Sequence, residues 1–209
     1  MNMDYINENA WSIDAIKQYL RSNVKQKRYE HIQGVAEAAK SLAALYGENI
    51  EHAEIAAYYH DILKDKDHDW LVSYIREMGE DPGEGILAWK TLHAQAGAIF
   101  ARSEGGMRDQ GILDAVRYHT TGRKNMTLLE KIIFVSDFIE AGRVFEGVEE
   151  IRTLAESDLD LAVLASLNSS ISYLKEQNAY VMSASLEAQI YYSNLISERT
   201  ADEKYNESY

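Results

Sequence analysis

The sequence predicts an all-α protein that folds as a single globular domain. Of the 209 residues, 46% are hydrophobic and only one is a proline, which is typical of helical proteins because proline interrupts helices. No segment alternates polar and apolar residues consistently, as a half-buried strand would. A chain of this length can bury a substantial core, so we expect one domain rather than two small ones.

The first four helices are predicted from apolar residues that recur at helical spacing. They are expected over residues 11–24, 25–46, 50–63 and 67–78. Ser12 and Asn49 are predicted to cap the first and third helices, because short polar side chains accept hydrogen bonds from free N–H groups at helix N-termini. Gly47 is predicted to end the second helix, since glycine readily adopts a left-handed conformation.

The remaining helices are predicted in the same way. They are expected over residues 86–102, 109–118, 127–143, 148–155, 158–175 and 183–199. The helix that begins after Thr127 has the best-defined start, because Thr127 and Glu130 have the spacing of a capping box. Residues 201–209 are polar and are expected to form a disordered tail.

Charge and composition exclude several classes of function. The formal net charge of -13 argues against binding a nucleic-acid backbone, which depends on Lys and Arg contacts to phosphates. The chain has no cysteine, so any metal must be held by nitrogen and oxygen ligands. The N-terminus lacks a signal peptide, and no stretch approaches the ~18 apolar residues of a membrane span. We therefore expect a cytoplasmic protein without a membrane partner.

His60 and Asp61 stand side by side in an apolar, alanine-rich run that is predicted to be helical. Helical periodicity places Lys64 one turn further along the same side. An imidazole and a carboxylate that converge on one point suit a divalent cation. Taken alone, the pair fits a buried histidine that is hydrogen-bonded to its neighbour at least as well.

Two further ionisable residues lie on helices that otherwise face the core. Asp137 interrupts the apolar run 132–139, and a buried carboxylate needs a partner because its desolvation is costly. His31 lies near the start of the second helix, three residues after Arg28. Together with His60 and Asp61 they offer two imidazoles and two carboxylates, a ligand set that suits iron, manganese or another first-row metal.

The order of these motifs resembles that of a known superfamily. The chain is similar to the HD-domain metal-dependent phosphohydrolases and, within them, to the YqeK family of bacterial HD proteins. The segments that carry the resemblance are 27–31, 60–64, 92–94, 117–122 and 137–143. The loop before the last helix departs from the family pattern, because Val181 and Met182 stand where a histidine and a proline are common. Nucleotide contacts there would come from backbone groups or serine hydroxyls.

The resemblance implies an HD-domain helical bundle with a specific activity. The family is described as symmetrical bis(5'-nucleosyl)-tetraphosphatases, which bind iron and cleave diadenosine tetraphosphate into two ADP. We therefore expect a divalent or trivalent metal, iron before manganese, cobalt or zinc. The implied metal ligands are His31, His60, Asp61 and Asp137. The implied catalytic residues are Asp61, Lys64, His93 and His119. The resemblance implies substrate contacts by Arg28, His31, Asp61, Lys64, His93, His119, Thr120, Asp137 and Arg143. The small-residue loop before the last helix adds Tyr180, Ser183 and Ser185 as candidates.

The chain is expected to form one domain, and two functions other than tetraphosphatase activity are also compatible with its motifs. Residues 1–200 are expected to form one HD-type domain, with a metal-site core over 25–145 and helices in 146–200 that complete the bundle. One alternative is a different HD phosphohydrolase, either a nucleotidase or a phosphodiesterase. The other is a metal- and nucleotide-binding sensor module without turnover. A homodimer is left open.

Overall fold

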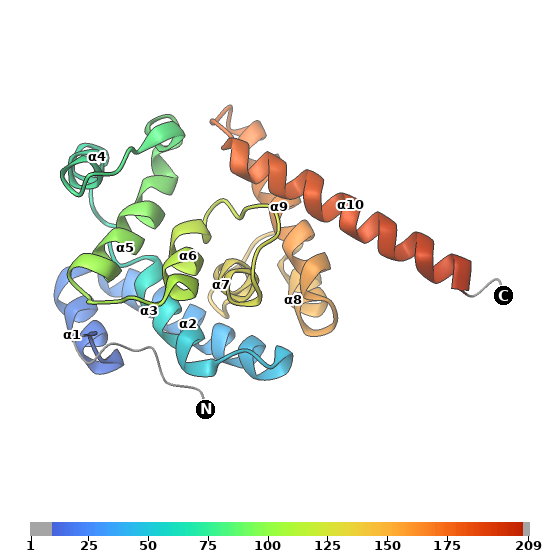
Figure 1. Cartoon of the computed structure of the whole chain (residues 1–209), viewed down its shortest axis with the longest axis horizontal. Helices are drawn as coiled ribbons and strands as arrows, with labels where there is room; N and C mark the ends of the chain where they lie inside the picture. Colours follow the sequence, from blue (N-terminus) through green and yellow to red (C-terminus); the bar gives the residue numbers. More distant parts are fainter. Residues whose placement is uncertain (1–9, 207–209) are drawn as a thin grey trace.

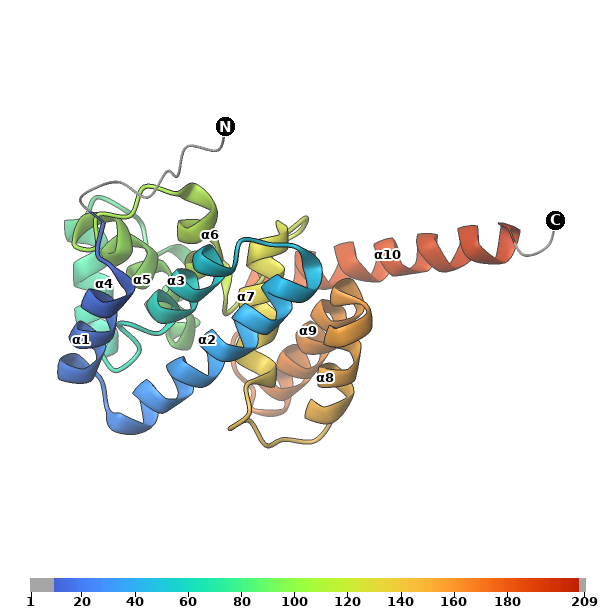
Figure 2. The same cartoon turned by 90° about the horizontal axis from the view of Figure 1, so that it is seen from below.

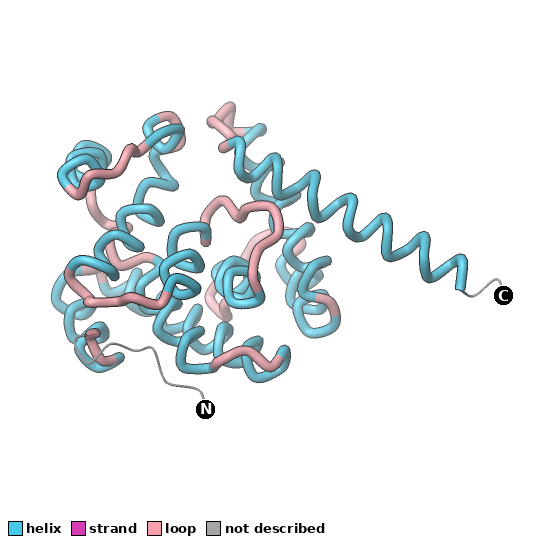
Figure 3. Tube along the Cα trace, in the orientation of Figure 1, coloured by secondary structure: helices cyan, strands magenta, loops and turns pink. Residues whose placement is uncertain are grey.

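The computed structural model describes residues 10–206, and in that range it contains only helices and loops (Figure 3). This confirms the all-α prediction. The α-helices are α1 Ile13–Asn23, α2 Gln26–Tyr46, α3 Ile50–His60, α4 His68–Glu77, α5 Leu92–Ser103, α6 Gln110–Tyr118, α7 Leu128–Ile139, α8 Val148–Ser157, α9 Leu159–Glu176 and α10 Ser183–Asn206. Two 3-10 helices, η1 Gly83–Ile86 and η2 Trp89–Thr91, connect α4 to α5. Within residues 10–206, no helix combines the length and the apolar character needed to cross a bilayer.

The predicted helix caps are confirmed. The side chains of Ser12 and Asn49 accept hydrogen bonds from backbone N–H groups in the first turns of α1 and α3. Gly47 ends α2 in the left-handed conformation, with a φ of 74°. Both hydrogen bonds of the capping box between Thr127 and Glu130 are present at the start of α7. These caps are local interactions, which is why the sequence reveals them.

Several predicted boundaries are wrong. The seventh helix ends at Ile139 rather than 143, with Glu140 as its C-cap. The third helix ends at His60 rather than 63, and the backbone continues in tight turns in which the Lys64 N–H donates to the Asp61 carbonyl. Lys64 is therefore not one helical turn beyond the pair. The fifth helix begins at Leu92 rather than 86, because the chain turns back sharply at Gly85. A Cβ at Gly85 would lie 2.7 Å from a methyl carbon of Leu92.

The last helix is longer than predicted. Helix α10 continues to Asn206, so residues 201–206 are helical and not a disordered tail. No glycine or proline interrupts the sequence after Ser183, and alanine, glutamate and lysine near its end favour helix. Figures 1 and 2 show the C-terminal half of α10 extending beyond α8 and α9. Residues 207–209 lie outside the described residues.

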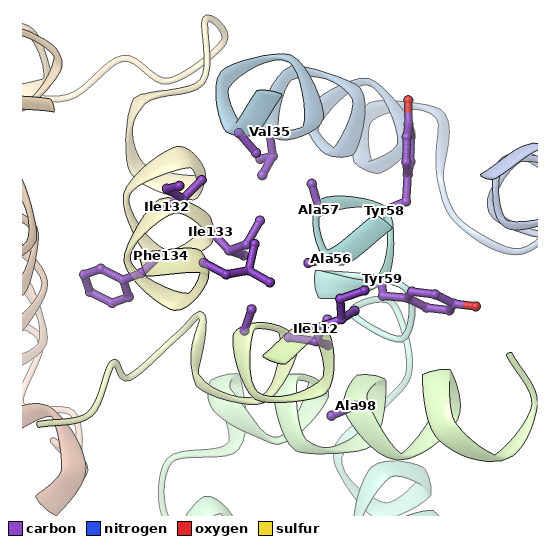
Figure 4. Close-up of a cluster of buried hydrophobic side chains, with 14 of the residues drawn as sticks. Val35, Ala56, Ala57, Tyr58, Tyr59, Ala98, Ile112, Ile132, Ile133 and Phe134 are labelled. Atoms are coloured by element: carbon purple, nitrogen blue, oxygen red, sulfur yellow. The ribbon is translucent and has the colours of Figure 1, made fainter. Parts of the chain in front are cut away.

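The core fixes the helices that carry the unusual ionisable residues. Helix α7 packs against α2, α6, α8 and α9, and α3 packs against α2, α5 and α6. Figure 4 shows Val35 of α2, Ala57 of α3 and Ile133 of α7 in one buried cluster, and all three side chains are fully buried. Close packing of this kind tolerates little displacement. The mutual positions of α2, α3 and α7 are therefore well defined.

Candidate active site

The four predicted metal ligands come together where α2, α3 and α7 meet. His31 lies on α2, His60 is the last residue of α3, Asp61 caps that helix and Asp137 lies near the end of α7. The Oδ2 atom of Asp61 is 3.6 Å from the Nε2 atoms of both His31 and His60. The His31 Nε2 atom is also 3.1 Å from Oδ1 of Asp137. Residues more than 100 positions apart thus form one cluster of potential ligand atoms.

The other oxygen atom of Asp61 faces two further histidines. Its Oδ1 atom is 2.9 Å from Nε2 of His93 on α5 and 3.6 Å from Nε2 of His119, which follows α6. The Lys64 Nζ atom is 3.2 Å from Nε2 of His93, so the turn after α3 brings it to the cluster without a continuous helix. Asp61 therefore faces His31 and His60 through one oxygen atom and His93 and His119 through the other, and the rings of His60 and His119 also meet each other.

Hydrogen bonds to the far ring nitrogens orient three of these imidazoles. Nδ1 of His60 donates to the Ala57 carbonyl at 2.6 Å, and Nδ1 of His119 donates to the Val116 carbonyl at 2.7 Å. Nδ1 of His31 is 3.1 Å from a carboxylate oxygen of Glu140. Such contacts leave Nε2 as the nitrogen that faces the cluster, as is usual for histidines that bind metals.

The protonation states suit a ligand set for a cation. Burial lowers the pKa of His60 to about 4, and burial together with Lys64 lowers the pKa of His93 to about 3. Burial alone would raise the pKa values of Asp61 and Asp137, but the surrounding histidines, and Arg143 beside Asp137, hold both well below the usual range. At neutral pH the cluster therefore offers neutral imidazoles at His60 and His93 and ionised carboxylates at Asp61 and Asp137, the forms in which these side chains bind metals. Burial alone would lower the pKa of His31, but the facing carboxylates, Asp137 above all, raise it.

The chemistry of these residues fits a divalent metal. The Nε2 atoms of His31 and His60 are buried. Within the described residues that of His60 makes no hydrogen bond, and that of His31 faces only carboxylates, with Oδ1 of Asp137 3.1 Å away. One ligand atom from each of His31, His60 and Asp61 lies within 4.8 Å of the others, and the same holds for His60, His119 and Asp137 and for Asp61, His93 and His119. Buried imidazole nitrogens without partners beside carboxylates are the donors that first-row divalent metals prefer.

Basic side chains surround the cluster although the chain as a whole is acidic. Arg28 pairs with Oδ2 of Asp61 at 2.6 Å, and Arg143 pairs with the carboxylate of Asp137 while its Nε donates to the Asp137 carbonyl at 2.7 Å. A cavity of about 260 Å³ adjoins the cluster on one side. Its lining residues are Arg28, Lys64, Lys66, Leu71, Lys90 and His93. Such a concentration of positive charge attracts anions despite the overall negative charge.

Three predicted substrate contacts lie further from the cluster. Tyr180 and Ser185 line a cavity of about 280 Å³ that also includes Lys90 and Thr120. Ser183 lines a neighbouring cavity that shares Thr120, and its N–H donates to Glu84. The Ser185 hydroxyl donates to the Thr121 carbonyl, so it is already engaged. Among the described residues, no hydrogen bond or ion pair joins these three to the metal-ligand candidates.

The structure adds residues to the site for which the sequence suggested no role. They are Lys66, Lys90, Phe138, Glu140, Phe145 and Tyr173. Glu140 follows Asp137 by three positions, so helical spacing could have placed it on the same side. Lys90 and Tyr173 reach the site only through the tertiary fold, and the sequence carries no signal for them.

Two comparisons relate this arrangement to known proteins. The HD domain family model matches residues 28–142, the part of the chain that contains the four ligand candidates, His93 and His119. The chain also resembles a crystal structure of an HD superfamily hydrolase from Clostridium acetobutylicum, described as involved in NAD metabolism. The TM-score is 0.86 and the sequence identity 39%, over 88% of this chain and 98% of the other.

Three proteins with similar sequences are named for the same enzymatic activity. The chain is 43% identical to a symmetrical bis(5'-nucleosyl)-tetraphosphatase of Halalkalibacterium halodurans over 77% of this chain and 86% of the relative. It is 32% identical to a protein of the same name from Staphylococcus aureus, over 92% of this chain and the whole relative. A Bacillus subtilis protein of that name is 39% identical over 161 residues.

Proposed function

Since this chain belongs to the HD domain family, we propose that it is a metal-dependent symmetrical bis(5'-nucleosyl)-tetraphosphatase. It cleaves diadenosine tetraphosphate at the central phosphoanhydride bond and releases two molecules of ADP. The observation that carries this function is the cluster of imidazoles and carboxylates beside a cavity lined by Arg28, Lys64 and Lys90. The cluster supplies a metal site, and the cavity supplies the charge that a polyphosphate needs. Relatives of this name at 32% to 43% identity support the same substrate.

His31, His60, Asp61 and Asp137 would hold the metal. When bound, a divalent metal there would supply Lewis-acid polarisation of a phosphoryl oxygen and would favour deprotonation of a water molecule at neutral pH. We propose iron as the metal, since the HD proteins that this chain resembles are described as iron-binding. Orphaned imidazole nitrogens beside carboxylates are consistent with iron and equally with manganese.

The remaining side chains act on the water and the phosphates. Asp61 positions the attacking water and accepts its proton, because its carboxylate lies between both histidine pairs. Water adds to one central phosphorus, the bridging P–O bond breaks, and ADP leaves with the electron pair. Lys64 donates hydrogen bonds to the bridging phosphates, and Arg28 and Arg143 neutralise the charge that develops on them. His93 and His119 face Oδ1 of Asp61 and keep its carboxylate in position for the reaction.

The test is a digestion of diadenosine tetraphosphate by protein loaded with Fe²⁺ or Mn²⁺, followed by anion-exchange chromatography. We expect ADP as the sole nucleotide product. Asp61→Asn is expected to abolish the reaction, whereas Glu146→Gln, an exposed acidic position in the loop after α7, is expected to retain it. Uncleaved substrate would contradict the assignment.

A substrate panel separates the other activities that an HD phosphohydrolase could have. Preferential hydrolysis of nucleoside monophosphates would identify a nucleotidase, and cleavage of phosphodiesters a phosphodiesterase. Metal and nucleotide binding without any turnover would identify a sensor module. Elemental analysis of protein purified without chelators tests the choice of iron. The cytoplasmic location and the homodimer stay predictions.

A further inference from the structure

A cleft of about 450 Å³ adjoins the metal-ligand cluster on the side of Asp137. His119, Thr120, Asp137 and Arg143 form the part of its lining that belongs to the site described above. The rest of the lining comes from the end of α7, the loop that follows it and α9, and α7, α8 and α9 lie side by side (Figures 1 and 2). The volume lies within the ~300–1,000 Å³ typical of small-molecule sites.

Aromatic side chains line the outer part of this cleft. Phe138 and Phe145 meet edge to face, with ring centroids 6.3 Å apart and an interplanar angle of 80°. Tyr173 lines the cleft from α9 although 54% of it is exposed to solvent. Ser169 and Ser170 precede Tyr173 by four and three positions, which places their hydroxyls on the same face of α9. Aromatic rings with free faces bind bases by stacking, and hydroxyls can hydrogen-bond a ribose or a base edge.

The cavity of about 260 Å³ described above is lined mainly by cationic side chains instead of aromatic ones. Among the side chains that the structure describes, its lining includes Arg28, Lys64, Lys66 and Lys90, with no aromatic residue other than His93. It therefore suits phosphates and not a nucleoside. Lys90 also lines the cavity of Tyr180, and Thr120 is shared between the Tyr180 cavity and the aromatic cleft. The Tyr180 cavity thus adjoins the cationic cavity at Lys90, whereas the aromatic cleft adjoins the Tyr180 cavity at Thr120 and reaches the cluster at His119 and Asp137.

We propose that the cleft of Phe138, Phe145 and Tyr173 binds the second nucleoside of the substrate, while the Tyr180 cavity binds the first. This inference rests on the proposed function, because only a substrate with a nucleoside at each end needs both places. Arg143 stands between the aromatic cleft and Asp137 and contacts the phosphates of the second half. With one nucleoside on each side, the central phosphoanhydride bond lies at the cluster, which accounts for a symmetrical cut.

The test compares diadenosine tetraphosphate with adenosine 5'-tetraphosphate, which has the same number of phosphates but a single nucleoside. Tyr173→Ala and Phe145→Ala are expected to raise the KM for diadenosine tetraphosphate about tenfold each, as expected for the loss of one base stack. The inhibition constant of adenosine 5'-tetraphosphate as a competitor is expected to change less than threefold, because its one nucleoside can still occupy the Tyr180 cavity. Tyr173→Phe keeps the ring and is expected to restore most of the affinity.

Leu45→Ala is the matched control, since Leu45 is also 54% exposed but lies on α2 in a separate groove with α8. It is expected to leave the KM unchanged, and circular dichroism melting verifies that every variant is folded. An unchanged KM in Tyr173→Ala and Phe145→Ala would overturn the second subsite while leaving the proposed function intact. Equal losses of affinity for diadenosine tetraphosphate and adenosine 5'-tetraphosphate would also overturn the second subsite, because they would indicate a general disturbance of the active site. Wild-type protein that leaves diadenosine tetraphosphate uncleaved would overturn the proposed function and the subsite with it.

Discussion

Asp61 connects the parts of the site because its two oxygen atoms face different partners. Oδ2 faces His31, His60 and Arg28, whereas Oδ1 faces His93 and His119. A single carboxylate in this position can hold a metal and orient a water molecule without rearrangement. The geometry shows how an aspartate directly after His60 reaches histidines of three other segments where α3 ends.

Glu140 is a positioning residue for His31. Its carboxylate accepts from Nδ1 of His31 at 3.1 Å and from the Gly142 N–H at 2.6 Å, and its side chain is buried. We expect Glu140→Gln to weaken metal binding at least about tenfold, since contacts to the far nitrogen of a ligating histidine typically contribute ~10–100-fold in affinity. Competition with a fluorescent chelator measures this change.

The control for Glu140 is Glu146→Gln, which removes the same charge from an exposed position of the same loop. Its metal affinity is expected to equal that of the wild type. Equal affinity in Glu140→Gln and the wild type would show that the contact to His31 has no role in metal binding.

At the residue scale, the sequence predicted which residues would attract attention as ligand candidates, because they interrupt an apolar pattern, and the structure brings these residues together. Asp137 stands in an otherwise hydrophobic helix, and His60 and Asp61 stand in an alanine-rich one. The HD family that these motifs suggested is confirmed. Lys90 and Tyr173 carried no such signal, because a lysine in a loop and an exposed tyrosine on a helix are ordinary. Only the fold brings them to the site.

At the scale of elements, α7 depends on its N-terminal cap. Thr127 accepts from the Glu130 N–H at 3.3 Å, and the Thr127 N–H donates to the Glu130 carboxylate at 2.7 Å. We expect Thr127→Ala to lower the free energy of unfolding by about 1 kcal/mol, because one N–H of the first turn loses its partner. Thr127→Ser keeps the hydroxyl and is expected to retain most of the stability. Urea denaturation measures both, and equal losses would contradict the role of the cap.

Glu80 joins three helices and makes their packing sensitive to acid. It lies after α4 and binds Arg102 of α5 at 2.7 Å and Arg117 of α6 at 2.8 Å. Burial alone would raise the pKa of Glu80, but hydrogen bonds from Arg102, Gln95 and Arg117 hold it below the usual value of 4.5. The folded state therefore favours the ionised carboxylate.

The sign of the pH dependence follows from that lowered pKa. The contribution of Glu80 to stability is present above about pH 4.5 and is lost as the pH falls from 4.5 through the folded pKa. In Glu80→Gln, we expect a smaller decrease in the free energy of unfolding between pH 6 and pH 3 than in the wild type. Urea titrations at each pH measure it. Parallel curves for the two proteins would contradict the assigned ion pairs.

Helix boundaries were predictable where a local cap sets them and were wrong where tertiary contacts do. Asn49 and Thr127 cap their own helices, so sequence spacing was sufficient. Helix α3 ends at His60 although Ile62 and Leu63 continue the apolar pattern, and beyond its end Asp61 and Lys64 contact Arg28 and His93 of other helices. The helix propensities of the residues contain no information on such contacts between helices.

At the scale of the whole molecule, metal binding links helices that are far apart in the sequence. His31, His60 and Asp137 belong to α2, α3 and α7, so a metal held by them stabilises the folded state and not the unfolded chain. We expect Mn²⁺ at about 100 times its Kd to stabilise the protein by about 2.7 kcal/mol. Calorimetry measures the increase in Tm. His60→Ala is expected to remove the increase, and a metal-dependent shift that persists in this variant would place the metal elsewhere.

The most direct test of the central claim is hydrolysis of diadenosine tetraphosphate by the metal-loaded protein in water enriched in ¹⁸O. Attack of water on a central phosphorus predicts ADP as the only nucleotide product. Mass spectrometry is expected to find one ¹⁸O atom in one of the two ADP molecules, on its terminal phosphate. Formation of ATP and AMP would contradict a symmetrical cut at this site, as would ADP that contains no ¹⁸O.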